Sequence, residues 1–246
     1  EGAIGTSIAK VFDMTVASTG LAAKRLKQFG IPYASSTTHS ASHAGYYPDA
    51  LPLTLKLTFD PASGKLYGGQ CVGYDGADKR IDQIALLIKQ GGTVYDLIKV
   101  EHAYAPPFSS AKDPIAIAGY VAGNIISGAM PVATWRQMAE ADRCDTLFLD
   151  VRTREEHAFG AIPGSVNIPL DELRGRIGEL PRDKEIYIYC AVGLRGYLAL
   201  KILTGHGFTR VKNLSGGYKT YATATAPIEN KTATIRTNGK TDTQHT

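Results

Sequence analysis

The chain has 246 residues, of which 43% are hydrophobic and 20% are charged, and its formal net charge is +4. This composition is that of an ordinary globular protein, and the length is sufficient for two domains. Because basic and acidic residues are interspersed and no apolar run approaches the ~20 residues of a membrane-spanning helix, we expect neither a nucleic-acid partner nor a membrane segment.

The first half of the chain mixes strands and helices without regular β-α-β alternation, which predicts an α+β domain with an antiparallel sheet. Strands are expected over residues 8–15, 51–59 and 66–74, and the last two form a hairpin. Helices are expected over residues 21–29, 80–90, 94–100 and 113–127. The sequence does not begin with Met and starts just ahead of the first strand, so we expect a fragment of a longer protein.

After Pro131 strands alternate with helices, which predicts an α/β domain with a parallel central sheet covered by helices. The strands are expected over residues 146–151, 161–169 (after a turn), 185–190 and 211–214. The helices are expected over residues 134–141, 154–159, 170–177 and 196–205. From Thr223 onward the sequence has little apolar content, so we expect domains at 1–129 and 130–222 and a disordered tail at 223–246.

The three cysteines lie far apart in the sequence, at positions 71, 144 and 190. No pair has the short spacing of a zinc site or of a redox Cys-x-x-Cys motif, so we expect no metal site. An odd number of cysteines without framework spacing favours a reducing, cytoplasmic location. We expect Cys71 to lie in the core of its domain and Cys144 to be an incidental thiol.

The context of Cys190 points to chemistry. This cysteine ends a predicted strand, and Arg195 lies where the next helix begins. The intervening loop consists of Ala191, Val192, Gly193 and Leu194. Such a loop directs backbone N–H groups at its centre, where a thiolate, a persulfide or an anionic donor such as thiosulfate would be stabilised. A buried cysteine that merely closes a strand is the alternative, but the glycine and arginine at these offsets favour a nucleophile.

Four segments, in this order, resemble the motifs of a rhodanese homology domain. They are residues 149–152 (LDVR), 155–169 (EEHAFGAIPGSVNIP), 189–195 (YCAVGLR) and 214–218 (LSGGY). The resemblance implies that Cys190 carries sulfur as a persulfide and that Arg195 assists it. The spacing found here, Cys-x4-Arg, resembles that of rhodaneses. The related phosphatases have a loop that is one residue longer. We therefore expect a sulfurtransferase in preference to a phosphatase or an arsenate reductase.

Other residues in these motifs are expected to have supporting roles. Asp150 occupies the position that the rhodanese family uses to hold the site, and we expect it to be a salt-bridging or helix-capping carboxylate. Arg152 and Arg154 either face the loop and attract anions or are solvated. Gly216 and Gly217 are expected to permit a close backbone approach beneath the loop.

The first half resembles a second family. Residues 5–12, 43–48, 73–82 and 104–109 are similar to the dimerisation domain of flavin-dependent pyridine nucleotide–disulfide oxidoreductases, with coenzyme A–disulfide reductases as the nearest subfamily. Together with the rhodanese motifs, this order resembles coenzyme A–disulfide reductase/rhodanese fusion proteins. The resemblance implies a homodimer. It also implies that FAD and NAD(P)H domains precede residue 1, that this fragment binds no cofactor itself, and that the parent uses FAD, NAD(P)H and coenzyme A.

The same resemblance assigns two tyrosines to a site in the partner subunit. Tyr46 and Tyr104 would lie near the substrate thiol, where a phenol can donate to a developing thiolate. The alternative is that both are half-buried packing residues. His43 and His102 are expected to be structural or hydrogen-bonded surface histidines and not ligands. The function expected is sulfur transfer through a Cys190 persulfide, within a flavoprotein that reduces coenzyme A persulfide, polysulfide or coenzyme A disulfide. A non-catalytic module for dimerisation and for docking coenzyme A or a partner is the alternative.

Overall fold

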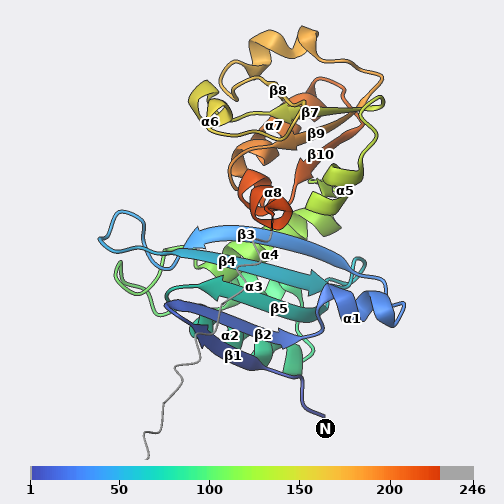
Figure 1. Ribbon diagram of the computed structural model, residues 1–246. Helices are drawn as coiled ribbons and strands as arrows, with labels where there is room; N and C mark the ends of the chain where they lie inside the picture. Colours follow the sequence, from blue (N-terminus) through green and yellow to red (C-terminus); the bar gives the residue numbers. More distant parts are fainter. Residues whose placement is uncertain (1, 228–246) are drawn as a thin grey trace, which may run out of the picture.

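The N-terminal domain is built on a five-stranded antiparallel sheet with the strand order β1-β2-β5-β4-β3 (Figure 1). The computed structural model describes residues 2–227. The strands are Ser7–Val11 (β1), Met14–Gly20 (β2), Ala34–Ala41 (β3), Pro52–Phe59 (β4) and Leu66–Gly73 (β5). Because side chains alternate between the two faces of a strand, Leu53, Leu55 and Leu57 of β4 are all buried on one face.

Three helices cover that buried face and leave the other face of the sheet open (Figure 1). These helices are Ala77–Lys89 (α2), Val94–Lys99 (α3) and Pro114–Ile126 (α4), and the short helix Ala23–Gln28 (α1) follows β2. The core between sheet and helices includes Leu55, Cys71, Ile84, Leu97 and Ile115. The domain is therefore α+β with an antiparallel sheet, as predicted.

The C-terminal domain is built on a parallel five-stranded sheet with the strand order β6-β10-β9-β7-β8. The strands are Val132–Ala133 (β6), Thr146–Asp150 (β7), Val166–Asn167 (β8), Glu185–Tyr189 (β9) and Val211–Leu214 (β10). The helices are Trp135–Glu140 (α5), Arg154–Ala158 (α6), the 3₁₀ helix Leu173–Glu179 (η1), Leu194–Gly205 (α7) and Gly217–Thr225 (α8). Ile186 and Ile188 of β9 face one apolar cluster, and Tyr187 and Tyr189 face another, so the central strand is buried on both sides.

Several element predictions were wrong in detail. The single strand expected over residues 8–15 is the hairpin of β1 and β2, which turns at Phe12, a residue with φ 54° and no turn-forming glycine beside it. Strand β3 was not predicted because it is almost wholly polar. Helix α8 was also missed, and it extends to Thr225, so the first residues of the expected tail are helical. The rest of that tail, from 228 onward, lies outside the described residues.

The two domains contact each other along β3 (Figure 1). The backbone N–H of Thr37 donates to Ser215 Oγ at 2.9 Å, and His39 Nε2 lies 2.8 Å from Thr220 Oγ1. Behind the sheet, Val121 of α4 packs against the apolar core of the second domain. No helix within residues 2–227 is long and apolar enough to cross a membrane.

Candidate functional site

The cysteine loop lies between β9 and α7. Cys190 follows the last residue of β9 and is 1% exposed, and the N–H of Gly193 donates to its Sγ at 3.1 Å. Gly193 has φ 122°, a value that favours glycine, and it immediately precedes the first residue of α7. The first turn of a helix has N–H groups without intrahelical partners and a partial positive charge. The strand and the helix therefore place the sulfur where negative charge is stabilised.

Helix α8 supports the loop from beneath. The N–H groups of Tyr218 and Lys219 donate to the carbonyl oxygens of Cys190 and Ala191 at 2.8 and 3.0 Å. Gly217 has φ 60°, and a Cβ atom there would lie 2.5 Å from the carbonyl oxygen of Cys190. The close backbone approach expected for this glycine is therefore present.

Asn213 of β10 supports the other end of the loop. Its Nδ2 donates to the carbonyl oxygen of Gly193 at 3.0 Å, and the absence of a side chain at Gly196 leaves room for the amide. Sequence reasoning did not identify Asn213, because a polar residue at the end of a short strand has no distinguishing pattern.

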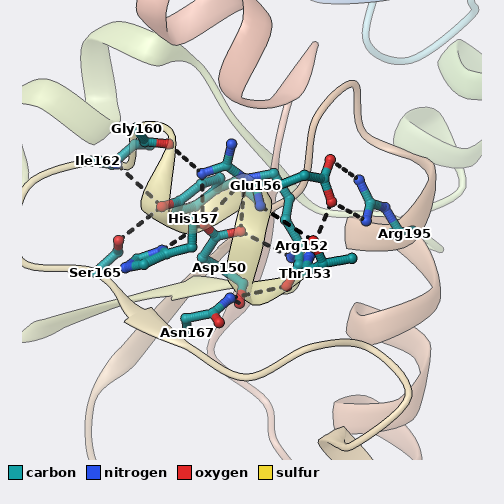
Figure 2. Close-up of polar contacts among 11 residues, drawn as sticks. Asp150, Arg152, Thr153, Glu156, His157, Gly160, Ile162, Ser165, Asn167 and Arg195 are labelled. Carbon is teal, nitrogen blue, oxygen red and sulfur yellow. Dashed lines mark hydrogen bonds and ion pairs between the residues drawn. The ribbon is translucent and has the colours of Figure 1, made fainter.

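Arg195 is held by a residue that sequence reasoning also missed. Its Nη1 and Nη2 atoms donate to the two carboxylate oxygens of Glu156 at 2.6 and 2.7 Å (Figure 2). The hydrogen bonds from Arg195 lower the pKa of Glu156 to about 2, and Glu156, with a smaller contribution from Cys190, raises the pKa of Arg195. Glu156 accepts from Thr153 in a capping box, a pattern that is visible in the sequence but does not reveal its arginine partner.

Asp150 is the centre of a buried polar network (Figure 2). Arg152 Nη2 donates to Asp150 Oδ2 at 2.7 Å and to the carbonyl oxygen of Gly160 at 2.7 Å, and His157 Nδ1 lies 2.9 Å from the same carboxylate. Burial alone would raise the pKa of Asp150, but the hydrogen bonds from Arg152 and His157 outweigh it and lower that pKa. The carboxylate thus fixes the segment that follows β7.

Arg152 and Arg154 were expected either to face the cysteine loop or to be solvated. Arg152 does neither, and Arg154 is solvated. Arg152 is 4% exposed, and its guanidinium is bound to Asp150 and Gly160, so it is neither solvated nor available to an anion at the loop. Its side chain also lies over the ring of Tyr218, 4.2 Å from the centroid. Arg154 is 65% exposed and pairs with Glu172, so it belongs to the solvated surface.

A cavity of about 600 Å³ lies between the cysteine loop and α4 of the first domain. Residues 192–194 of the loop form one side, and Tyr120 and Val121 form the other. Among the described residues that line it, Lys112 is the one with a permanent charge. The approach to the loop is therefore shaped by both domains, which no motif in the sequence indicated.

The two tyrosines implicated by resemblance lie side by side. The hydroxyl oxygens of Tyr46 and Tyr104 are 3.0 Å apart, and the residues are 77% and 48% exposed. His43 is buried, with Nδ1 3.2 Å from the carbonyl oxygen of Ala44. Burial lowers the pKa of His102, whose ring nitrogens have no hydrogen-bond partner among the described residues.

A buried ion pair anchors both tyrosine-bearing loops. Arg80 and Asp113 are 1% exposed, and Arg80 Nη2 lies 2.8 Å from Asp113 Oδ2. The same arginine nitrogen donates to the carbonyl oxygen of Ser42, and Ser109 Oγ donates to the same carboxylate oxygen. Because Ser42 and Ser109 border the two loops, this pair fixes where the tyrosines lie.

The remaining thiols differ from Cys190. Cys71 is fully buried in the first domain, and burial raises its pKa to about 12. Cys144 is exposed. Within residues 2–227, no group of His, Cys, Asp and Glu has the arrangement of a metal site.

Two protein families match the chain. The pyridine nucleotide-disulphide oxidoreductase dimerisation domain matches residues 6–114, and the rhodanese-like domain matches residues 131–224. Coenzyme A disulfide reductase of Staphylococcus epidermidis is 43% identical over 122 residues, which are 50% of this chain and 27% of that protein. The Staphylococcus aureus reductase is 40% identical over the same shares. The chain thus spans about a quarter of the length of these curated relatives.

Two solved structures resemble both domains together. Reduced Bacillus anthracis CoADR-RHD has a TM-score of 0.87 and 50% sequence identity, covering 89% of this chain and 39% of its own. The NAD-dependent persulfide reductase from A. fulgidus has a TM-score of 0.78 and 39% identity, covering 88% and 39%. The chain therefore consists of a pyridine nucleotide–disulphide oxidoreductase dimerisation domain followed by a rhodanese-like domain, and is homologous to the C-terminal part of coenzyme A disulfide reductases and persulfide reductases.

Proposed function

We propose that this chain transfers sulfane sulfur through a persulfide on Cys190. The observation that carries the proposal is the position of Cys190 Sγ at the base of a strand-to-helix loop, where Gly193 N–H donates to it at 3.1 Å. Arg195, at the rim of the loop, is oriented by Glu156. The rhodanese-like family and the persulfide reductase among the similar structures support this chemistry.

The transfer consists of two substitutions at sulfur. The Cys190 thiolate attacks the outer sulfur of a persulfide, a polysulfide or thiosulfate, and the donor's S–S bond breaks. The donor leaves with the electron pair, as a thiolate or as sulfite, and Cys190 carries the sulfur as a persulfide. An acceptor thiolate then attacks that outer sulfur and regenerates the Cys190 thiolate. The two steps balance without an oxidant or a reductant.

The ion pair between Glu156 and Arg195 determines which groups stabilise negative charge on the sulfur. Because the carboxylate is bound to both terminal guanidinium nitrogens, the Arg195 charge is largely compensated at the rim. Stabilisation of the negative sulfur therefore rests mainly on the Gly193 N–H and on the N-terminal end of α7. Arg195 then acts as an oriented donor at the entrance to the loop.

The names of the relatives suggest the setting of the reaction. We infer that coenzyme A is the acceptor and that the first domain forms a homodimer in a flavoprotein that reduces coenzyme A persulfide, polysulfide or coenzyme A disulfide. The chain has no Gly-x-Gly-x-x-Gly loop, so FAD and NAD(P)H would be held by other domains of the longer protein. Tyr46 and Tyr104 would face the substrate thiol of the partner subunit, and the reducing cytoplasm would keep the thiols active.

Sulfur transfer from thiosulfate or polysulfide to cyanide and to coenzyme A tests the proposal. We expect activity in the wild-type chain, none in Cys190→Ala or Cys190→Ser, and a mass gain of one sulfur atom on the peptide that contains Cys190. Cys144→Ala is the matched control, because it removes an exposed thiol that precedes β7 and is not part of the loop, and it should transfer sulfur normally. A folded, dimeric wild-type chain that loads no sulfur would instead indicate a module for dimerisation and docking. Hydrolysis of phosphate esters by the same chain would point to a phosphatase.

A further inference from the structure

A second cavity lies between the antiparallel sheet, on the face opposite α2, α3 and α4, and helices α5 and α8 of the rhodanese-like domain. It has a volume of about 670 Å³ and is lined by residues of both domains. None of the residues from 190 to 194 lines it, although Thr37, His39 and Ser215 line both this cavity and the one at the cysteine loop. We refer to it as the interdomain cleft.

The charged residues that line the interdomain cleft are all cations. They are Lys56 of β4, Arg136 of α5 and Lys219 of α8, and no carboxylate of residues 2–227 lines the cleft. Lys56 faces the cleft because its strand neighbours Leu55 and Leu57 are buried in the core on the opposite face. The cations converge only because the two domains are in contact.

These positive charges are not neutralised within the part of the chain that the structure describes. None of the three cations forms an ion pair there. Burial, and then the charge of Arg136, lower the pKa of Lys56. Burial, and then the charge of Lys219, lower the pKa of His39 in the same cleft to about 4. Like charges that face one another in a partly buried cavity are unfavourable unless an anion joins them.

The remaining lining supplies groups that suit a phosphate. The hydroxyls of Ser18 and Ser35 line the cleft and can donate to phosphate oxygens. Arg136 is held over the ring of Trp135, with its guanidinium carbon 4.8 Å from the ring centroid. A guanidinium fixed in this way can bind two oxygens of one phosphate.

We infer that the interdomain cleft binds a small molecule that carries phosphate groups and bridges the two domains. The inference goes beyond the proposed sulfur transfer and does not depend on it. Free phosphates and a phosphorylated thiol such as coenzyme A share this chemistry. Inorganic pyrophosphate, coenzyme A and pantetheine, which has the thiol arm of coenzyme A without the nucleotide, distinguish between these sources.

Trp135 gives a direct readout, because it is the single tryptophan of the chain and lines the cleft. We would titrate the chain with each probe at low, constant ionic strength and follow tryptophan fluorescence, with calorimetry in parallel. Coenzyme A or pyrophosphate should give a saturable change, and pantetheine should give none. Saturation by coenzyme A alone would assign the cleft to a phosphorylated thiol, and saturation by pyrophosphate as well would assign it to phosphate groups in general.

Charge-neutralising variants complete the test. Lys56→Gln and Lys219→Gln should each weaken binding about tenfold, the loss expected for one charge-assisted hydrogen bond. Lys89→Gln is the matched control, since Lys89 is exposed on α2 at the helix-covered side of the sheet, and it should bind as the wild type does. Affinity that is unchanged in the Lys56→Gln/Lys219→Gln double variant would overturn the inference. So would pantetheine binding as tightly as coenzyme A, or no saturable signal from any probe on the folded chain. Cyanide-dependent sulfur transfer should be unchanged in Lys56→Gln, whose residue lies on β4 and makes no contact with the cysteine loop, and this separates the cleft from the proposed function.

Discussion

Replacement of Gly217 by alanine should disrupt the cysteine loop although residue 217 lies outside it. The added Cβ would lie 2.5 Å from the carbonyl oxygen of Cys190 and 2.7 Å from that of Ala191. The left-handed conformation, φ 60°, itself costs an L-residue about 1–2 kcal/mol. The two carbonyls would also have to move away from Tyr218 N–H and Lys219 N–H, and each weakened hydrogen bond costs about 1 kcal/mol. We therefore expect a loss of about 3–4 kcal/mol in the free energy of unfolding.

Urea unfolding monitored by tryptophan fluorescence measures this loss, because Trp135 lies in α5 of the rhodanese-like domain. Sulfur transfer should fall together with the unfolding midpoint, since the carbonyl of Cys190 itself must shift. Gly205→Ala is the matched control. A Cβ at Gly205 meets nothing within 4 Å, so that variant should unfold at or slightly above the wild-type midpoint. A Gly217→Ala chain with wild-type stability and wild-type transfer would refute the assigned role of this glycine.

Three further changes probe the charged groups. Glu156→Gln should lower stability by roughly 1 kcal/mol, because the pair is about one-third exposed. The same variant leaves the Arg195 charge uncompensated, so the rate of sulfur loading from thiosulfate should fall more steeply with ionic strength. Initial rates over a salt series measure this dependence. Asp150→Asn leaves Arg152 buried without a counter-charge and should cost about 3–5 kcal/mol in urea unfolding. His39 has a folded-state pKa of about 4, below its ordinary 6.5, so protonation favours the unfolded state and stability should fall as the pH drops from about 6.5 towards 4. Thermal unfolding over a pH series should show this slope in the wild type and a smaller slope in His39→Gln.

The predictable parts of the fold are those whose sequence pattern is compatible with only one type of secondary structure. Strand β9 is an apolar run buried on both faces, and Gly193 marks the loop that follows it. Strand β3 lacked such a signal, because its Ser, Thr and His side chains form an edge strand that is completed by pairing with β4 and by contact with the second domain. Its structure follows from partners that lie far along the chain.

The site was predictable to the same extent. The spacing of Cys190 and Arg195 indicated the nucleophile and its arginine because both lie on one short loop. Glu156 is 39 residues from Arg195, and Asn213 is 20 residues from Gly193, so neither partner could be paired from spacing alone. Arg152 was misplaced for the opposite reason. Its bond to Asp150, two residues away, depends on both side chains turning into the domain interior, which a local pattern does not specify.

The segment from Ser215 to Thr220 joins the cysteine loop to the contact between the domains. Its backbone N–H groups at Tyr218 and Lys219 hold the loop, and the hydroxyls at its two ends bind β3 through Thr37 and His39. An alanine at Gly217 must therefore displace either the loop carbonyls or the segment itself. In the second case the hydrogen bonds to β3 change. Thr220 then leaves His39 and the histidine becomes more accessible to water. The pH slope assigned to His39 should then weaken in Gly217→Ala as well, whereas a shift confined to the loop would leave that slope intact.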